Sequence, residues 1–160
     1  MKSINLKSIL FASTLAFGSI VFNGCNKDDD DNNTDKMYTI SGTANGSQMS
    51  PSVTGTGTAD ITGTYSAKTN VLTYTSTWTG LTGAPTSAAF YSGTSGVNGA
   101  IVGSSWALGS GLTGTGTFSG TITLTDAEET QLLAGGLYYT YNTTAHASGE
   151  VRGQITASPQ

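Results

Sequence analysis

The stretch that decides the fold is "VLTYTSTWTG", residues 71–80. Successive side chains of an extended strand point to opposite faces of a sheet. Leu72, Tyr74, Ser76 and Trp78 therefore share one face, and the intervening threonines share the other with Val71. An aromatic face opposite a threonine face predicts a strand in a sheet with one packed side and one solvated side.

Other segments have the same strand-like character, with glycine-rich turns between them. They are "MYTISGT" (37–43), "SAAFYSG" (87–93), "GAIVGSSWAL" (99–108), "GTGTFSGTITL" (114–124), "LYYTYNT" (137–143) and "GEVRGQITA" (149–157). Disordered chains combine high charge with few aromatic residues, whereas this chain is only 10% charged and 9% aromatic. We therefore expect an all-β domain over residues 37–160, an antiparallel β-sandwich or Greek-key barrel of about eight strands.

One short helix is predicted at about residues 126–134, within "TDAEETQLLAGG". Thr125 is a suitable N-cap, and Glu128 stands at the capping-box position. Leu132 and Leu133 are expected to pack inward, before the glycines that follow end the helix. The acidic residues of the first turn thus have a structural role, because the helix dipole favours them there.

Residues 1–24 are typical of an export signal. Lys2 and Lys7 precede an apolar stretch, 9–22, that is short for a membrane span. The single cysteine, Cys25, follows directly after Gly24, an arrangement that resembles the lipobox of bacterial lipoproteins. The resemblance implies that Cys25 is lipidated and becomes the mature N-terminus. The alternative is an ordinary signal peptide followed by an incidental free thiol.

Residues 25–36, "CNKDDDDNNTDK", form an acidic tether that is expected to be solvated and self-repelling. Lys27, Asp28 and Asp29 resemble the surface-export signal of Bacteroidetes lipoproteins. This resemblance implies an outer-membrane lipoprotein that is exposed at the cell surface. A plain spacer is the alternative, and a calcium loop is disfavoured because the run lacks the EF-hand spacing.

The distribution of charge excludes one class of partner. The chain carries a formal charge of −4, and residues 37–160 contain only Lys68 and Arg152 as basic residues against five acidic ones. Binding to a phosphate backbone needs several lysines or arginines. We therefore expect no nucleic acid as a partner.

Candidate catalytic residues are few. His146, the only histidine, lies in the polar segment "TTAHASG", and no Gly-x-Ser-x-Gly pattern is present. Zinc and copper sites need several His or Cys ligands. The spacing of Asp60, Glu150 and the acidic residues at the helix start does not indicate a glycosidase pair. We expect no catalytic residue, no metal and no cofactor, and we interpret His146 as a loop residue.

The segment "HASGEVRGQI", residues 146–155, holds the only arginine. Glu150 and Arg152 lie two residues apart on a predicted strand, so they should share a face and could form a charge-assisted bond. Gly149 and Gly153 fit a close approach of backbone. The pair is either an internal structural contact or a ligand clamp, and we favour the structural contact.

Several segments together resemble the CHRD domain, and they span most of residues 38–156. These are "YSAKTNVLTYTSTWTGLTG" (65–83), "YSGTSGVNGAIV" (91–102), "LTDAEETQLLAGGLYYTYNT" (124–143) and "SGEVRGQI" (148–155). The last is the most specific and matches the family's closing fingerprint with Gly149, Glu150, Arg152, Gly153 and Gln154. The resemblance implies an extracellular β-sandwich with no established enzymatic activity.

The chain departs from the family at three positions. Histidines typical of the family fall here on Ala89, Tyr91 and Asn142, whereas Asn98 and Gly99 of a turn are retained. A histidine cluster that could bind metal in relatives is therefore expected to be lost.

These observations together predict a lipid-anchored, surface-exposed domain with a non-catalytic binding or structural role in the cell envelope. Its expected partners are the membrane, through the lipid, and an envelope protein or glycan. Aromatic side chains could supply the contact surface if they are exposed: Tyr65, Tyr91, Tyr138, Tyr139, Tyr141, Trp78 and Trp106. In the other interpretation most of these residues are core, as alternation indicates for Trp78. A metal-binding or redox envelope protein is the alternative function, disfavoured by the absent histidines.

Overall fold

The computed structural model describes residues 35–160. The expected signal peptide, the lipidation site Cys25 and the export signal Lys27, Asp28 and Asp29 lie outside the described residues. Within the described part, no helix is long and apolar enough to cross a membrane.

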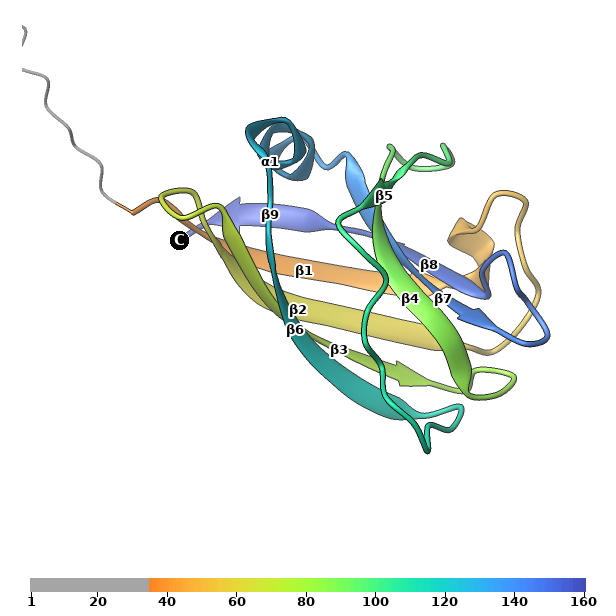
Figure 1. Ribbon diagram of the computed structural model, residues 1–160. Coiled ribbons are helices and arrows are strands. Elements are labelled where there is room, and N and C mark those ends of the chain that lie inside the picture. The colour runs from red at the N-terminus through yellow and green to blue at the C-terminus, as the bar shows by residue number, and fades with distance from the viewer. Residues whose placement is uncertain (1–34) are drawn as a thin grey trace, which may run out of the picture. The chain divides into compact units, whose positions relative to one another are not determined.

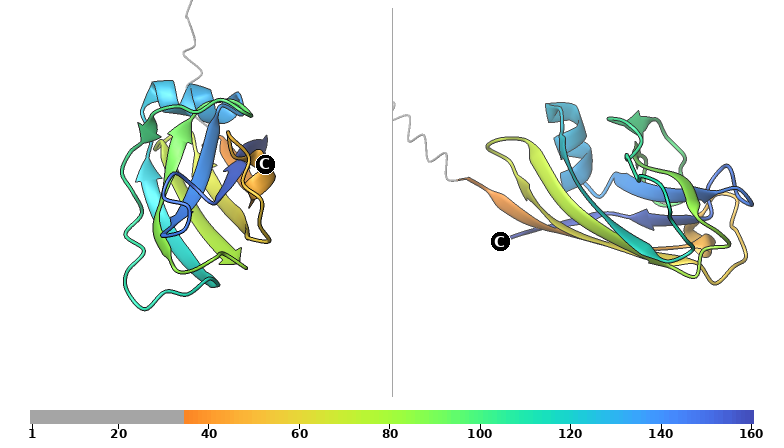
Figure 2. Two further views of the ribbon diagram at one scale, coloured as in Figure 1. Left: turned by 90° about the vertical axis from the view of Figure 1, so that its right-hand side faces the viewer. Right: turned by 60° about the horizontal axis from the view of Figure 1, so that its bottom comes forward.

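The described chain forms one antiparallel sheet of nine strands and one short α-helix, which confirms the predicted all-β class (Figure 1). The strand order is β5-β4-β7-β8-β1-β2-β3-β6, and β9 also pairs with β1. Figure 2 shows that the sheet curls around its inner face. The strands are β1 (Met37–Asn45), β2 (Thr58–Ser66), β3 (Val71–Thr79), β4 (Pro85–Ser92), β5 (Ile101–Val102), β6 (Gly116–Thr123), β7 (Leu137–Thr143), β8 (Val151–Gln154) and β9 (Thr156–Pro159).

Strand β3 has the predicted two faces. Leu72, Tyr74, Ser76 and Trp78 are buried, and the alternating threonines are exposed. β3 pairs without a register shift with β2 on one side and with β6 on the other. The amphipathic pattern of this strand thus fixes which face of the neighbouring strands encloses the core.

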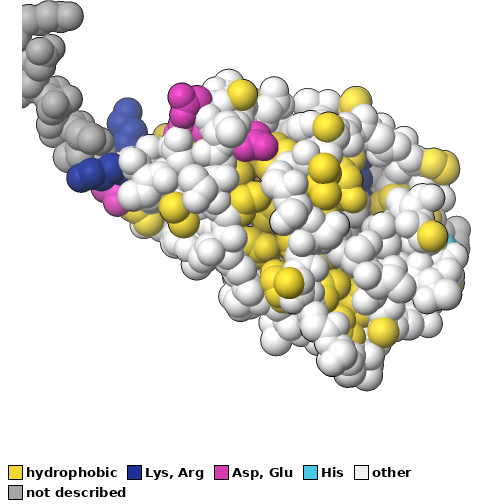
Figure 3. Space-filling model, in the orientation of Figure 1, with side chains coloured by type: hydrophobic (Ala, Val, Ile, Leu, Met, Phe, Trp, Pro, Cys, Tyr) yellow, Lys and Arg dark blue, Asp and Glu magenta, His cyan; other side chains and the backbone are white. Residues whose placement is uncertain are grey.

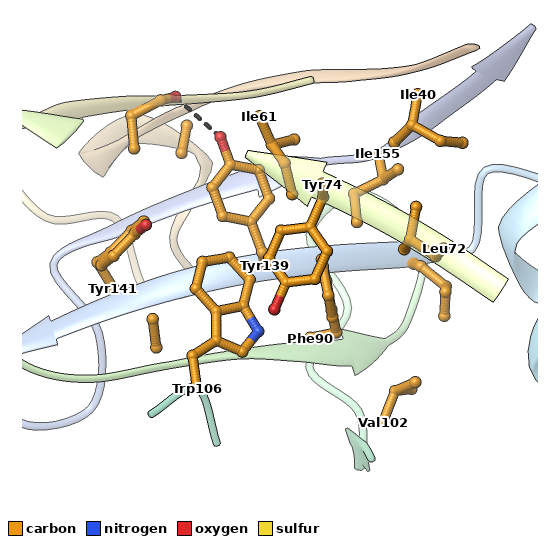
Figure 4. Packing of buried hydrophobic residues seen from close by; sticks show 14 of the residues in the cluster. Ile40, Ile61, Leu72, Tyr74, Phe90, Val102, Trp106, Tyr139, Tyr141 and Ile155 are labelled. Carbon is orange, nitrogen blue, oxygen red and sulfur yellow. Dashed lines mark hydrogen bonds between the residues drawn. The ribbon is translucent and has the colours of Figure 1, made fainter. Parts of the chain in front are cut away.

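A crossing segment between β5 and β6 completes the core and corrects one expectation. Of the predicted strand 99–108, only β5 is a strand, because the chain turns away at Gly103, whose φ is +70°. Trp106 then enters the core, where its ring centroid lies 4.9 Å from that of Tyr74 and 5.0 Å from that of Phe90 (Figure 4). After β5 the chain thus leaves the sheet ladder, and Trp106 fills the interior of the curled sheet while its backbone N–H donates to the Ala88 carbonyl of β4 at 2.8 Å.

Helix α1 (Asp126–Leu133) has the predicted capping box. The Glu128 N–H donates to Thr125 Oγ1 at 3.3 Å, and the Thr125 N–H donates to Glu128 Oε2 at 2.7 Å. Leu132 is buried, but Leu133 is 39% exposed, so the expectation that both pack inward was wrong for Leu133. Adjacent helical residues point about 100° apart, and only one of them faces the core.

Strand β7 is buried on both faces. Tyr139 and Tyr141 point into the core, whereas Tyr138 and Thr140 lie on the outer face and are only 4% and 6% exposed. Two loops cover this outer face: residues 46–53, which begin with the 3-10 helix η1 (Gly46–Gln48), and residues 93–100. They create a second, smaller interior on the outside of the sheet.

Candidate functional site

A pocket of about 420 Å³ lies between the outer face of β4, β7 and β8 and the two covering loops. The strands contribute Tyr91, Tyr138, Thr140 and Arg152 to its lining. The loops contribute residues 49–51 and 98–99, and Ser148 stands at the turn before β8. We call this the Arg152 pocket.

Arg152 reaches the pocket because β8 places it opposite Thr140 of β7. Its side chain is 1% exposed, and its guanidinium carbon lies 3.6 Å from the centroid of the Tyr138 ring. The Tyr138 ring is also stacked against Tyr91, with centroids 5.3 Å apart and an interplanar angle of 16°. Both contacts are favourable, a cation–π pair contributing about 0.5–2 kcal/mol and an aromatic pair about 0.5–1.5 kcal/mol.

The hydrogen bonds of Arg152 go to neutral acceptors. Nη2 donates to the Thr94 carbonyl at 2.7 Å and to Gln154 Oε1 at 3.3 Å, and Nη1 donates to Asn98 Oδ1 at 3.3 Å. Burial lowers the pKa of Arg152, and the neighbouring Tyr138 opposes this effect. The site thus holds a buried cation without a bonded carboxylate among residues 35–160.

The covering loops are fixed by direct contacts. Asn98 Nδ2 donates to the Ser50 carbonyl at 2.8 Å, which joins one loop to the other. The Gly99 N–H donates to the Tyr138 hydroxyl at 3.2 Å, which joins the loop to β7.

The sequence predicted Asn98 and Gly99 only as a turn and gave no role to Thr94. The alternation in "LYYTYNT" could have predicted that Tyr138 and Tyr139 point to opposite faces of the sheet.

Glu150 lies in a different network. Its Oε1 accepts from the Thr82 N–H at 2.7 Å, and its Oε2 accepts from the Thr82 and Thr143 hydroxyls, each at 2.6 Å. The possible Glu150–Arg152 bond is therefore not formed. Gly149 has φ +122° and β8 begins only at Val151, so strand alternation does not extend to Glu150.

The acidity of Glu150 follows from these contacts. Its side chain is 2% exposed, and burial alone would raise the pKa of its carboxyl. The hydrogen bonds from Thr143 and Thr82 act in the opposite direction and prevail, so the pKa lies below its usual value. Glu150 is therefore ionised at neutral pH and connects β7 with the turn after β3.

The other fingerprint residues make close packing contacts. A Cβ at Gly153 would lie 2.6 Å from Tyr139 Cε1 and 2.9 Å from Ala44 Cβ, so the position needs glycine. Gln154 Nε2 lies 2.8–2.9 Å from the carbonyls of Gly93, Gly135 and Leu137. Gln154 thereby joins a covering loop, the end of α1 and the start of β7.

The residues that were weighed for catalysis or metal binding do not form one site, although His146 is near enough to Glu150 to help lower the pKa of that carboxyl. His146 is in the turn after β7, where its backbone N–H donates to the Thr143 carbonyl at 3.1 Å. Asp60 Oδ1 accepts from the Thr43 hydroxyl at 2.8 Å on β1. In the part of the chain that the structure describes, no three His, Cys, Asp or Glu side chains are grouped closely enough to hold a metal ion.

The three positions at which the family resemblance implies histidines share the outer face. Ala89 and Tyr91 stand opposite Thr140 and Tyr138, respectively, in the β4–β7 ladder. Asn142 accepts at Oδ1 from the Thr140 hydroxyl at 3.2 Å, which places it on the same side. These positions therefore border or line the Arg152 pocket.

The aromatic side chains that might have formed a contact surface are mostly internal. Tyr91 alone among the seven is partly exposed. The interpretation of these residues as core is therefore the correct one for the other six, which are buried: Tyr65, Tyr138, Tyr139, Tyr141, Trp78 and Trp106. Charged side chains on the face in Figure 3 gather around α1 and the start of β1, and apolar groups show across the middle of this face among uncoloured side-chain and backbone atoms.

Comparison with known proteins identifies the family of this domain. No curated protein and no solved structure matches the chain. The family model of the CHRD domain matches residues 40–155, which include most of β1, every strand from β2 to β8 and the fingerprint around Arg152. Such a domain indicates a binding or structural role. The chain belongs to the CHRD domain family.

Proposed function

We propose that this protein is a lipid-anchored, surface-exposed CHRD domain that binds a partner of the cell envelope without catalysing a reaction. The observation that carries the proposal is the Arg152 pocket, a fixed hollow with one buried cation and a half-buried tyrosine, Tyr91, at its margin. A site whose loops are already held in place loses little entropy when a ligand enters.

Non-catalytic binding agrees with the placement of the acidic side chains. Glu150 is engaged with Thr82 and Thr143, and Glu128 closes the capping box. Asp126 accepts from Asn70 Nδ2 at 3.1 Å, and Asp60 accepts from Thr43. A general acid or base must face the reacting group within hydrogen-bond reach, whereas these carboxylates serve structural contacts outside the pocket.

The proposed anchoring is supported by the sequence. Cys25 follows the apolar leader and precedes the acidic tether with Lys27, Asp28 and Asp29. Acyl chains would bind the membrane with roughly 0.8 kcal/mol per buried methylene. The tether would then hold the domain away from the membrane surface.

Anchoring and exposure are tested in cells that express the full chain. Radiolabelled palmitate should label the wild type and should not label Cys25→Ala. Protease added to intact cells should degrade the wild-type domain, and replacement of Lys27, Asp28 and Asp29 by alanine should protect it. Protection of the wild-type domain would contradict surface exposure.

Binding is tested by capture of material from envelope fractions with the immobilised full chain. Tyr91→Ala should reduce capture, because Tyr91 lines the pocket and is its only partly exposed aromatic side chain. Tyr38→Ala is the matched control, a partly exposed tyrosine on β1 outside the pocket. Equal capture by both variants and the wild type would exclude the pocket as the binding site.

A further inference from the structure

We propose that the Arg152 pocket binds the carboxylate of an acidic sugar. This inference rests on the proposed binding function and names the ligand class of the same site. Three properties of the pocket carry it: the buried guanidinium without a paired carboxylate, the tyrosine stack beside it and the hydroxyl groups in the remaining lining.

The guanidinium supplies the argument for a carboxylate. Arginine has five N–H donors, and three of them are used by Thr94, Asn98 and Gln154, all neutral acceptors. Its Nε–H and the second Nη1–H have no hydrogen-bond partner among residues 35–160. A buried charge is costly unless an opposite charge pairs with it, and an entering carboxylate would provide that charge.

The tyrosines and the polar lining supply the argument for a sugar. Tyr138 is covered by Arg152 and by Tyr91, so the accessible aromatic surface of the pocket is that of the partly exposed Tyr91. This surface is suited to the apolar C–H face of a pyranose ring. Ser148 adds a hydroxyl group, and the Thr140 oxygen can still accept while its proton is donated to Asn142 Oδ1, so both can bond sugar hydroxyls. The volume of about 420 Å³ is within the range of small-ligand pockets.

The net charge of the whole chain restricts the class of anionic ligand that the pocket can bind. The net charge of −4 repels dense polyanions. Affinity for an anion must therefore come from the local site at Arg152, which can pair with one carboxylate. A sugar with a single carboxylate fits this site better than a phosphate polymer.

The test is isothermal titration of the full chain, purified in detergent, with sodium glucuronate. Glucose, which has a similar ring and no charge, and sodium acetate, which has a carboxylate and no ring, are the comparison ligands. We expect glucuronate to bind and each comparison ligand to bind at least tenfold more weakly.

Asn98→Asp makes the test specific for Arg152. Asn98 Oδ1 lies 3.3 Å from Nη1, so aspartate would supply an internal counter-charge to the guanidinium, although it would lose the hydrogen bond from Asn98 Nδ2 to the Ser50 carbonyl. We expect this variant to remain folded and to bind glucuronate at least tenfold more weakly than the wild type. Ser95→Asp is the matched control, since it adds the same charge at an exposed position of the same loop. It should bind glucuronate as the wild type does.

Three results would overturn the proposal. They are absence of glucuronate binding by the wild type, equal binding of glucose, and unchanged binding by Asn98→Asp. Acetate binding as tightly as glucuronate would also contradict it, and would indicate a site for a bare carboxylate such as a peptide C-terminus. If envelope material is still captured in a Tyr91-dependent way but glucuronate does not bind, the sugar assignment fails and the binding function stands.

Discussion

At the scale of single residues, the two charged members of the fingerprint have different roles. Glu150 binds hydroxyls and a backbone N–H near the turn after β3, and Arg152 lies under the loop 93–100 on the outer face. The sequence shows that the residues belong to one fingerprint. It could not show their partners, because Thr94 and Asn98 are 58 and 54 residues away from Arg152. Which loop covers an arginine depends on tertiary packing and not on local pattern.

Replacement of Glu150 by glutamine should reveal its role through pH. At pH 7 we expect Glu150→Gln to lower the free energy of unfolding by about 1.5–3 kcal/mol, the contribution of hydrogen bonds to a charged group. The folded-state pKa of Glu150 lies below its ordinary value of 4.5. Its stabilisation is therefore present above that value and is lost as the pH falls through the folded-state pKa.

Urea unfolding at pH 7 and at pH 3 measures this effect. The difference between the wild type and Glu150→Gln should be smaller at pH 3 than at pH 7. An equal difference at both values would show that the ionised carboxylate does not matter.

A second residue-scale prediction concerns metals. The positions that correspond to family histidines hold Ala89, Tyr91 and Asn142, so copper, zinc, iron or calcium should leave the melting temperature of the full chain unchanged. A rise of several degrees in differential scanning calorimetry would indicate a metal site. Asp60, His146 and Glu150 would then be the first residues to replace.

At the scale of elements, short sequence patterns correctly predicted the features that depend on interactions between neighbouring residues. The alternation in β3 and the capping box of α1 are both short-range, and both are present in the structure. The segment 99–108 has a strand-like composition, yet after β5 it leaves the ladder and places Trp106 among the aromatic rings of the core, with one backbone hydrogen bond to Ala88 of β4. Tertiary packing overrides strand propensity there.

The cap of α1 provides the element-scale prediction. Thr125→Ala removes the hydroxyl that accepts from the Glu128 N–H and should cost about 1 kcal/mol of unfolding free energy. Thr123→Ala, at the exposed end of β6, should cost less than about 0.5 kcal/mol. Chemical denaturation of both variants measures the difference, and equal losses would contradict a specific role of the cap.

At the scale of the whole molecule, the sheet encloses its core by curling, and the crossing segment brings Trp106 into contact with both ends of it. Trp106 packs against Phe90 of β4, with ring centroids 5.0 Å apart, and against Phe118 of β6, at 5.5 Å. The class of the fold follows from many short amphipathic strands. The strand order cannot be predicted from those short patterns, because pairing between β1 and β8 joins residues that are distant in sequence.

We therefore expect Trp106 to contribute to the free energy of unfolding mainly by filling space in the core. Trp106→Ala should cost about 3–5 kcal/mol in unfolding free energy. Trp106→Phe should cost less than half as much, because it keeps an aromatic ring in the core and Trp106 Nε1 has no hydrogen-bond partner among residues 35–160 to lose. Thermal and urea unfolding of both variants tests this, and equal losses would show that the ring does not act by filling the core.

The central claim is that the Arg152 pocket is a ligand-binding site, and the single arginine allows a direct measurement. Because the chain contains one arginine, the Nε–H signal in a ¹H–¹⁵N spectrum of the full chain reports on Arg152 alone. We predict that sodium glucuronate shifts this signal in a saturable way, that glucose does not, and that Asn98→Asp abolishes the shift. An Arg152 signal that stays fixed while glucuronate is added to high concentration would contradict the claim.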